Sequence, residues 1–175
     1  MYDSFGKLSL EELNAKAEEL MNSGDVDGLR DLANENGLGD LADMYAEGES
    51  DWLCEDAMDA AMARIDIEAD DLGAEEIMGD WADYIRSLVM ENEEVANQVM
   101  NPKKSFKGCV GKLAAFAITH AEPLDSDIIK SMDKAVSDAQ LSKLNMQREH
   151  LKYTKIGMPG IGTAKKLIRA YYAEG

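Results

Sequence analysis

A cysteine and a histidine lie eleven residues apart in the second half of the chain, a pairing that could support thiol–imidazole chemistry. On one helix, however, Cys109 and His120 would be about 16 Å apart at a rise of 1.5 Å per residue. A nucleophile and its base must lie within hydrogen-bond reach, so the spacing favours a core thiol. The other histidine, His150, has no partner at a workable spacing. We therefore predict no catalytic site and no enzyme.

Acidic residues around position 70 raise the question of a calcium loop. A loop beginning at Asp66 would place Glu68 and Asp70 at ligand positions. However, Asp71 stands where the loop needs glycine, and Ile77 where it needs a bidentate glutamate. The two cysteines of the chain form neither a disulfide framework nor a zinc site. The sequence therefore predicts a solvated acidic turn, with no metal and no cofactor.

Lysines gather in two glycine-containing segments of the C-terminal half. Residues 103–112 hold a Gly-x-x-Gly, but the RNA-binding loop with that pattern needs surrounding strands, so we favour close helix packing at the glycines. Residues 156–168 are similar to a helix-hairpin-helix turn, whose backbone amides bind a DNA phosphate. Because Lys166 stands where that turn needs a small residue, we favour a plain helix start. The basic candidates for binding nucleic acid or a partner are Lys103, Lys104, Lys107, Lys112, Lys165, Lys166 and Arg169.

Charge is distributed unevenly along the 175 residues, which carry 18 basic and 35 acidic side chains and a formal charge of −17. Residues 1–97 hold 28 acids and 5 bases, a net −23, whereas residues 98–175 hold 7 acids and 13 bases, a net +6. This asymmetry indicates a partner or nucleic acid, unless the halves only complement each other within one fold. The acidic candidates for binding a partner are Asp66, Glu68, Asp70, Asp71, Glu75 and Glu76.

Membrane and export signals are not found in the sequence. No apolar run approaches the ~20 residues of a membrane-spanning helix, and the N-terminus lacks the basic-then-apolar order of a signal peptide. We therefore expect a soluble cytoplasmic protein with no membrane partner.

Helical spacing of apolar residues dominates the chain, and no strand-length alternation of β-branched residues occurs. Capping residues predict helix starts at Ser9, Asp25, Ser50–Asp51, Ser105 and Asp125. We expect an all-α protein of about eight helices, including a short helix over about 39–47, a further one over about 138–153 and a final one over 163–172. An acidic helical-hairpin region over 1–72 should precede a main helical bundle over 73–175 with a basic C-terminal part.

The strongest helical stripe lies between residues 77 and 89 and should face the core. The helix beginning at Ser50–Asp51 should turn Trp52 and Leu53 inward and end near Ile67. The residues expected to be largely buried in the bundle are Trp81, Ile85, Leu88, Phe106, Cys109, Leu113 and Phe116.

Residues from about 84 to 136 resemble the PcfK-like family of bacterial conjugative plasmids and other mobile elements. The similar features are Tyr84 and Ile85 on a helix, an acidic stretch at 91–94, and Asn-Pro-Lys-Lys-Ser-Phe-x-x-Cys-Val over 101–110 entering an apolar helix. Asp-Ser-Asp-Ile over 125–128 is similar to the family's next helix start. The chain lacks the Tyr-Tyr-Asp-Glu-Asp run associated with the family.

The broader group includes anti-CRISPR inhibitors of Cas9 carried by phages and mobile elements. The resemblance therefore implies a protein that binds a CRISPR effector such as Cas9 in the bacterial host cytoplasm and blocks it by protein–protein contact. An acidic surface suits the positively charged groove in which such effectors hold nucleic acid. The alternative is a DNA- or RNA-binding accessory protein of a phage or conjugative element that uses the basic C-terminal region.

Overall fold

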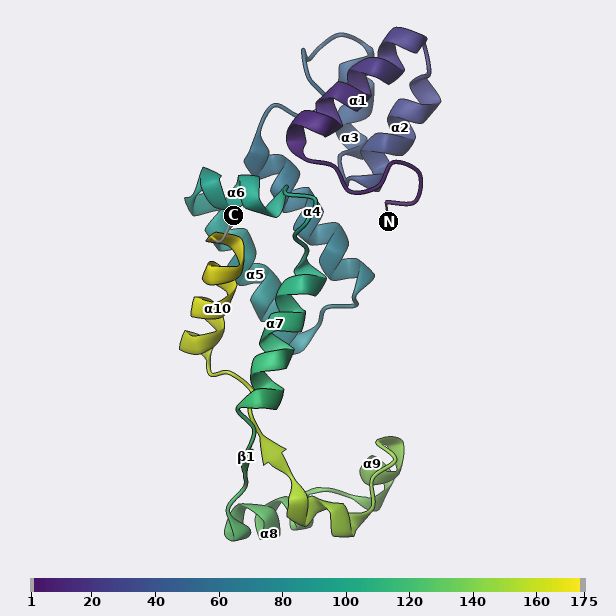
Figure 1. Cartoon of the computed structure of the whole chain (residues 1–175). Helices are drawn as coiled ribbons and strands as arrows, with labels where there is room; N and C mark the ends of the chain where they lie inside the picture. Colours follow the sequence, from purple (N-terminus) through teal and green to yellow (C-terminus); the bar gives the residue numbers. More distant parts are fainter. Residues whose placement is uncertain (1, 174–175) are drawn as a thin grey trace.

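The structure, a computed structural model, describes residues 2–173 and is all-α, as predicted (Figure 1). In this range it contains ten α-helices, one 3-10 helix and a ladder of two very short strands. The first helices are α1 (Leu10–Ser23), α2 (Val26–Glu35), α3 (Gly39–Ala46), α4 (Ala57–Asp71), α5 (Glu76–Glu91), α6 (Glu93–Val99) and α7 (Phe106–Thr119). There follow β1 (Glu122–Pro123), α8 (Ser126–Ala135), α9 (Asp138–Lys143), η1 (Arg148–Tyr153), β2 (Lys155–Ile156) and α10 (Ile161–Ala173).

Residues 2–56 form an N-terminal unit in which α2 packs against both α1 and α3. The predicted capping box is confirmed: the Ser9 hydroxyl accepts from the Glu12 amide, and the Glu12 carboxylate accepts from the Ser9 amide. Gly24 ends α1 at φ 76°, a left-handed conformation that glycine adopts without strain. The two helices therefore turn back on each other as a hairpin, which buries Leu13 against Leu29 and Leu32 within one core.

The body of the molecule comprises residues 57–121 and 157–173. Helix α4 packs against α5, α6 and α7, and α10 returns from far along the chain to pack against α5, α6 and α7. Helix α7 begins at the predicted cap, where the Ser105 hydroxyl accepts from the Gly108 amide. The body is thus closed by a helix separated from α7 by about forty residues of sequence.

Those intervening residues, 122–156, form an arm that projects away from the body (Figure 1). The strands β1 and β2 pair antiparallel at its root, with Glu122 opposite Ile156 and Pro123 opposite Lys155. Asp125 caps α8 as predicted, and α8 packs against η1. A side chain on Gly157 would collide with the carbonyl oxygen of Ala117 and the backbone of Ala121, so glycine permits the close contact between the arm's root and the end of α7.

One continuous hydrophobic core runs through the N-terminal unit and the body but not into the arm. The predicted core residues of α5 and α7 are buried, except that Phe116 is half-buried and stacks on His120. The arm's own buried leucines, Leu141 and Leu151, lie outside this core. Among the helices of residues 2–173, none has both the length and the apolar character needed to cross a membrane.

Three expectations about local structure need correction. Helix α4 begins at Ala57 rather than near residue 50, because the Asp56 side chain accepts from the Met58 amide and caps it. Helix α4 continues through Asp71, so residues 68–71 are helical and not a turn. The helix expected over 138–153 is divided into α9 and η1, with Asn145 at φ 52° between them. The two-residue ladder was not predicted either.

The expected boundary between residues 72 and 73 falls between α4 and α5, which pack against each other. The hydrophobic core crosses that point. By its contacts, α4 packs with the helices of the body, and the acidic residues 2–56 precede it within the same hydrophobic core.

Candidate interaction surfaces

The acidic candidates fall into two environments at the end of α4 and the start of α5. Asp66, Asp70, Asp71, Glu75 and Glu76 are exposed, and we call these five residues the acidic junction. Asp66 forms an ion pair with Arg86 at 2.7 Å. The other four form no ion pair within residues 2–173, so their charges face solvent unneutralised.

The sixth acidic candidate, Glu68, is 3% exposed and does not belong to any surface. Its carboxylate lies 2.6 Å from the Lys7 ammonium and accepts a hydrogen bond from the Phe106 amide. Glu68 therefore joins the N-terminal segment to the start of α7. The expectation that it contacts a partner is wrong, because its charge is already satisfied inside the protein.

Arg64 lies one turn before Glu68 on α4 and is equally buried, at 2% exposure. Its guanidinium donates to the carbonyl oxygens of Leu8 and Val99. Tyr2 lies with its ring under this guanidinium, and burial raises the Tyr2 pKa to about 12. Buried charges are stable only when paired and hydrogen-bonded, so this cluster fixes the chain's first residues against the body.

One basic candidate, Lys104, is also buried and is not free to meet a partner. Its ammonium lies 5.9 Å from the centre of the Tyr171 ring, and its carbonyl oxygen accepts from the Lys7 ammonium at 2.9 Å. The Tyr171 hydroxyl in turn accepts from the Ser105 amide at 3.1 Å. Residues 104–105, at the start of the lysine-containing segment, thus contribute to the packing between α6, α7 and α10.

The other six basic candidates are exposed, on the entry to α7, on α7 itself and on α10. None of them forms an ion pair with a carboxylate in the part of the chain that the structure describes. Lys165 and Arg169 both lie against the Tyr84 ring, at 4.6 and 5.7 Å from its centre. The two helices that carry most of these cations, α7 and α10, pack against each other.

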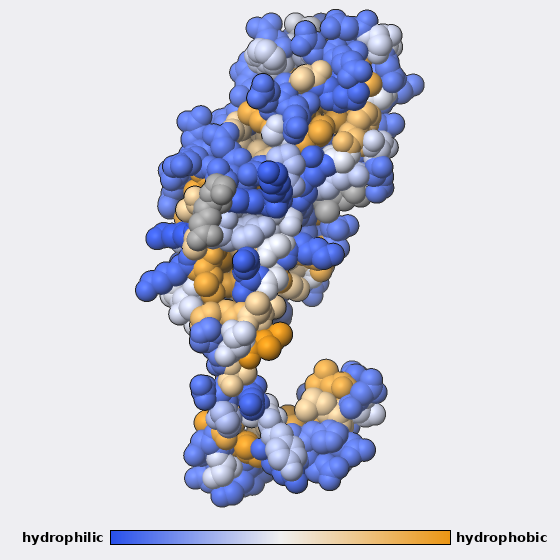
Figure 2. Space-filling view, in the orientation of Figure 1, coloured by the Kyte–Doolittle hydropathy of each residue, from blue (hydrophilic) through white to orange (hydrophobic). Residues whose placement is uncertain are grey.

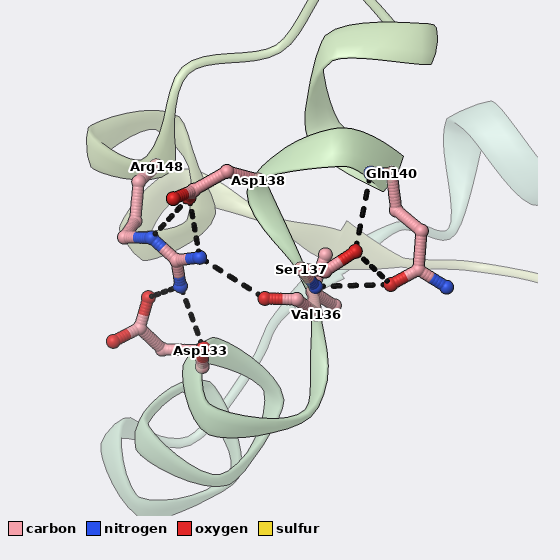
Figure 3. A network of polar contacts seen from close by, with 6 residues as sticks. All are labelled: Asp133, Val136, Ser137, Asp138, Gln140 and Arg148. Carbon is pink, nitrogen blue, oxygen red and sulfur yellow. Dashed lines mark hydrogen bonds and ion pairs between the residues drawn. The ribbon is translucent and has the colours of Figure 1, made fainter.

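The arm holds its shape through one polar network rather than through a core (Figure 3). The Arg148 guanidinium donates to the Asp133 and Asp138 carboxylates at 2.7 and 2.6 Å, and to the Val136 carbonyl oxygen at 3.0 Å. These hydrogen bonds raise the pKa of Arg148, so the group stays charged. Several large apolar side chains remain exposed on the arm, namely Ile128, Leu144, Tyr153 and Ile156.

Cys109 and His120, the candidate thiol–imidazole pair, lie at opposite ends of α7. Burial raises the pKa of the Cys109 thiol to about 12, which disfavours the thiolate that a nucleophile requires. His120 lies at the far end of α7 against Phe116. Within residues 2–173, no three His, Cys, Asp or Glu side chains are grouped so that they could hold a metal ion.

Trp52 is a surface residue that the sequence reasoning placed in the core, and its side chain is 51% exposed. It lies in the segment between α3 and α4, which was expected to be the first turn of a helix. Three residues of this segment, Ser50, Asp51 and Asp56, could cap a helix, and Asp56 is the one that does so. An Asp directly before the alanine-rich stripe of α4 was the signal that favoured the later start.

Comparison with protein-family models, with curated proteins and with solved structures finds no match to this chain. The resemblance to PcfK-like proteins therefore stays a prediction.

Proposed function

We propose that this protein binds a nucleic-acid-handling effector of the bacterial host, with Cas9 as that effector, and blocks its activity by protein–protein contact. The observation that carries the proposal is the unneutralised acidic surface. Residues 1–56 contain 16 acids and 3 bases. Four carboxylates of the acidic junction, unpaired with any cation of the described residues, add to this negative charge. The family resemblance supports the choice of effector, and the host cytoplasm is where the two would meet.

Electrostatic attraction explains how such a surface finds its target. Cas9-type effectors hold nucleic acid in a positively charged channel whose lysines and arginines otherwise meet phosphates. Exposed carboxylates increase the rate of encounter with such a channel, and salt screens this attraction over about 10 Å at 0.1 M ionic strength. The visible face of α1–α3 is mostly hydrophilic (Figure 2).

A cleavage assay with purified Cas9, its guide and a DNA target tests the proposal. The junction variant replaces Asp70, Asp71, Glu75 and Glu76 with Asn or Gln and leaves the buried Glu68 intact. The control variant replaces Glu91, Glu93, Glu94 and Glu149, which are exposed, lie outside residues 1–56 and the acidic junction, and change the net charge equally. We expect the junction variant to inhibit about tenfold less well at low salt than the control.

Two results would contradict the proposal at different levels. If the wild-type protein leaves Cas9 cleavage unchanged at low and moderate salt, Cas9 inhibition is wrong. If the wild type inhibits Cas9 but both variants lose inhibition equally, inhibition depends on the net charge of the protein and the acidic junction is not the contact.

A second function, as a DNA- or RNA-binding accessory protein of a mobile element, is favoured by the six exposed cations, which form no ion pair with any carboxylate of residues 2–173. Lysines and arginines that neutralise phosphates give an affinity that falls steeply with salt. A gel shift at two salt concentrations, with Lys165, Lys166 and Arg169 replaced by Gln, tests this function. The accessory function is favoured over inhibition if the wild type has no effect on Cas9 and the triple substitution weakens its binding to nucleic acid.

A further inference from the structure

The segment around Trp52 is held firmly although the Trp52 side chain faces solvent. The Ser50 hydroxyl bonds both the amide and the carbonyl oxygen of Trp52. The Asn14 side chain bonds the Cys54 backbone twice, with its amide nitrogen 2.8 Å from the carbonyl oxygen and its own oxygen 3.0 Å from the amide. Leu53 is buried between these points. The half-exposed Trp52 side chain is therefore attached to a backbone that is held on both sides by hydrogen bonds.

Two hollows adjoin this ring, and we call them together the Trp52 groove. One, of about 360 Å³, extends toward Leu41 and Met44 of α3. The other, of about 440 Å³, extends along α1 past Leu10 and Ala15. Both include Trp52, Cys54 and Glu55 in their lining. Both sizes lie in the range of hollows that bind ligands, and each hollow is lined by apolar and acidic side chains together.

The rim of the groove is acidic on three sides. Glu11 and Glu18 border it from α1, Glu55 from the loop and Asp59 from α4. None of these four carboxylates forms an ion pair with a cation of residues 2–173. The groove thus combines an exposed indole face with free negative charge, which is complementary to a side chain that is both planar and cationic.

We infer that the Trp52 groove is the docking site for an arginine-bearing basic segment of a partner protein. A guanidinium stacks on the face of tryptophan, is less strongly hydrated than an ammonium, and donates to carboxylates in pairs. Tryptophan surrounded by a polar rim is also the commonest centre of a protein–protein hot spot. The inference deepens the proposed function, since it names the contact that would hold a basic effector after electrostatic encounter.

Titration with two peptides tests the chemistry without the effector. The probes are a capped nonamer of arginine and a capped nonamer of lysine, and calorimetry at 50 and 150 mM salt measures their binding to the full chain. We expect the arginine peptide to bind roughly three- to fivefold more tightly than the lysine peptide at each salt concentration. Trp52→Ala should remove this preference, and Trp52→Phe should retain part of it.

Matched charge variants separate the groove from the net charge. The groove variant replaces Glu11, Glu18 and Glu55 with Gln, and the control replaces Glu91, Glu93 and Glu94, so both raise the net charge by three. We expect only the groove variant to weaken binding of the arginine peptide by more than about fivefold. Circular dichroism of each variant verifies that the helices are retained.

Three results would overturn the inference. One is equal affinity for the arginine and lysine peptides, with no effect of Trp52→Ala. Another is equal weakening by the groove and control variants. The third is a concentration-dependent dimer that Trp52→Ala abolishes, because a second copy would then be the occupant.

The Cas9 cleavage assay, run with wild type and Trp52→Ala, keeps the two proposals distinguishable. If binding of the arginine peptide depends on Trp52 but the wild type does not inhibit Cas9, the proposed function is wrong and the docking site at the Trp52 groove stands. If Trp52→Ala inhibits Cas9 as well as the wild type does and the peptides bind equally, the docking site at the Trp52 groove is wrong and the proposed function stands.

Discussion

The N-terminal unit and the arm are both joined to the body, but different interactions hold each of them in place. The unit shares the body's hydrophobic core and is bonded to it by the buried Arg64, whose guanidinium meets the Leu8 and Val99 carbonyl oxygens. The arm lies outside that core and is ordered by Arg148, whose side chain is 41% exposed. An unpaired buried charge is strongly destabilising, whereas an exposed pair is screened by water. The unit should therefore unfold with the body, and the arm should unfold alone.

Arg64→Met should give the largest effect of the changes that test this comparison. It removes the charged donor from two carbonyl oxygens, that of Val99 in the interior and that of Leu8 in a part-buried position. We expect the free energy of unfolding to fall by about 3–5 kcal/mol. Urea titration measures the loss, and a fall below 1 kcal/mol would contradict the view that the unit and the body are one cooperative structure.

Arg148→Met is the corresponding change in the arm. It removes the donor that connects Asp133, Val136 and Asp138, so α8, α9 and η1 should open more often. Hydrogen exchange should become roughly tenfold faster at arm amides, as expected for loss of a small network of exposed pairs, while α1–α3 amides keep their protection. Faster exchange throughout the chain would mean that the arm is coupled to the core.

Removal of the arm should change the stability of the remaining protein little. Replacing residues 124–154 with Asn-Gly would connect Pro123 to Lys155 through a two-residue turn across the existing antiparallel pair. Because no residue of the core belongs to the arm, we expect the free energy of unfolding to stay within about 1 kcal/mol. Deletion of residues 2–9, which removes Lys7 from Glu68, serves as the contrasting truncation and should destabilise the protein clearly.

The smallest expected effect concerns two capping boxes, one in each region. At α1 the box uses the Glu12 carboxylate, and hydrogen bonds from Ser9 lower the Glu12 pKa. At α9 the box uses Gln140, which does not titrate (Figure 3). A carboxyl whose pKa is lowered by folding stabilises the protein above its ordinary pKa of 4.5, and this contribution is lost as the pH falls through the lowered value.

Hydrogen exchange at pH 7 and pH 3 compares the two boxes. After correction for the intrinsic rates, the first turn of α1 should lose protection at pH 3, whereas that of α9 should change less. Glu12→Gln should abolish the pH response of α1, and Glu11→Gln, in the same turn but outside the box, should leave it. An unchanged response in Glu12→Gln would assign the effect to another group.

Local signals in the sequence predicted much of the fold. Caps at Ser9, Ser105 and Asp125 mark helix starts because their side chains bond amides two or three residues away. The apolar stripes of α5 and α7 predicted burial of Trp81 and Phe106 because one face of each helix meets the body's core. These features depend only on neighbouring residues.

The candidate sites were less predictable because burial of a charge depends on distant partners. Arg64 and Glu68 fall on the same helical face as Ala57, Ala60, Ala61 and Ile65, so the stripe of α4 already contained the signal that they point inward. Their partners lie far away in sequence: the Leu8 and Val99 carbonyl oxygens for Arg64, and Lys7 and the Phe106 amide for Glu68. Lys104 carried no local sign of burial, and the ring that covers its side chain belongs to α10.

The position of α10 in the chain has a consequence for synthesis. The apolar hollow between α5 and α10, lined by Trp81, Tyr84 and Ile168, cannot form until residues 161–173 have been made. At about 5–20 residues per second, the 52 residues from 122 to 173 take roughly 3–10 s to add. During those seconds the nascent body presents the face of α5 uncovered while the arm is being made. A ribosome paused within the arm would thus hold a chain that is helical but open, and this is the interval in which chaperones would find it.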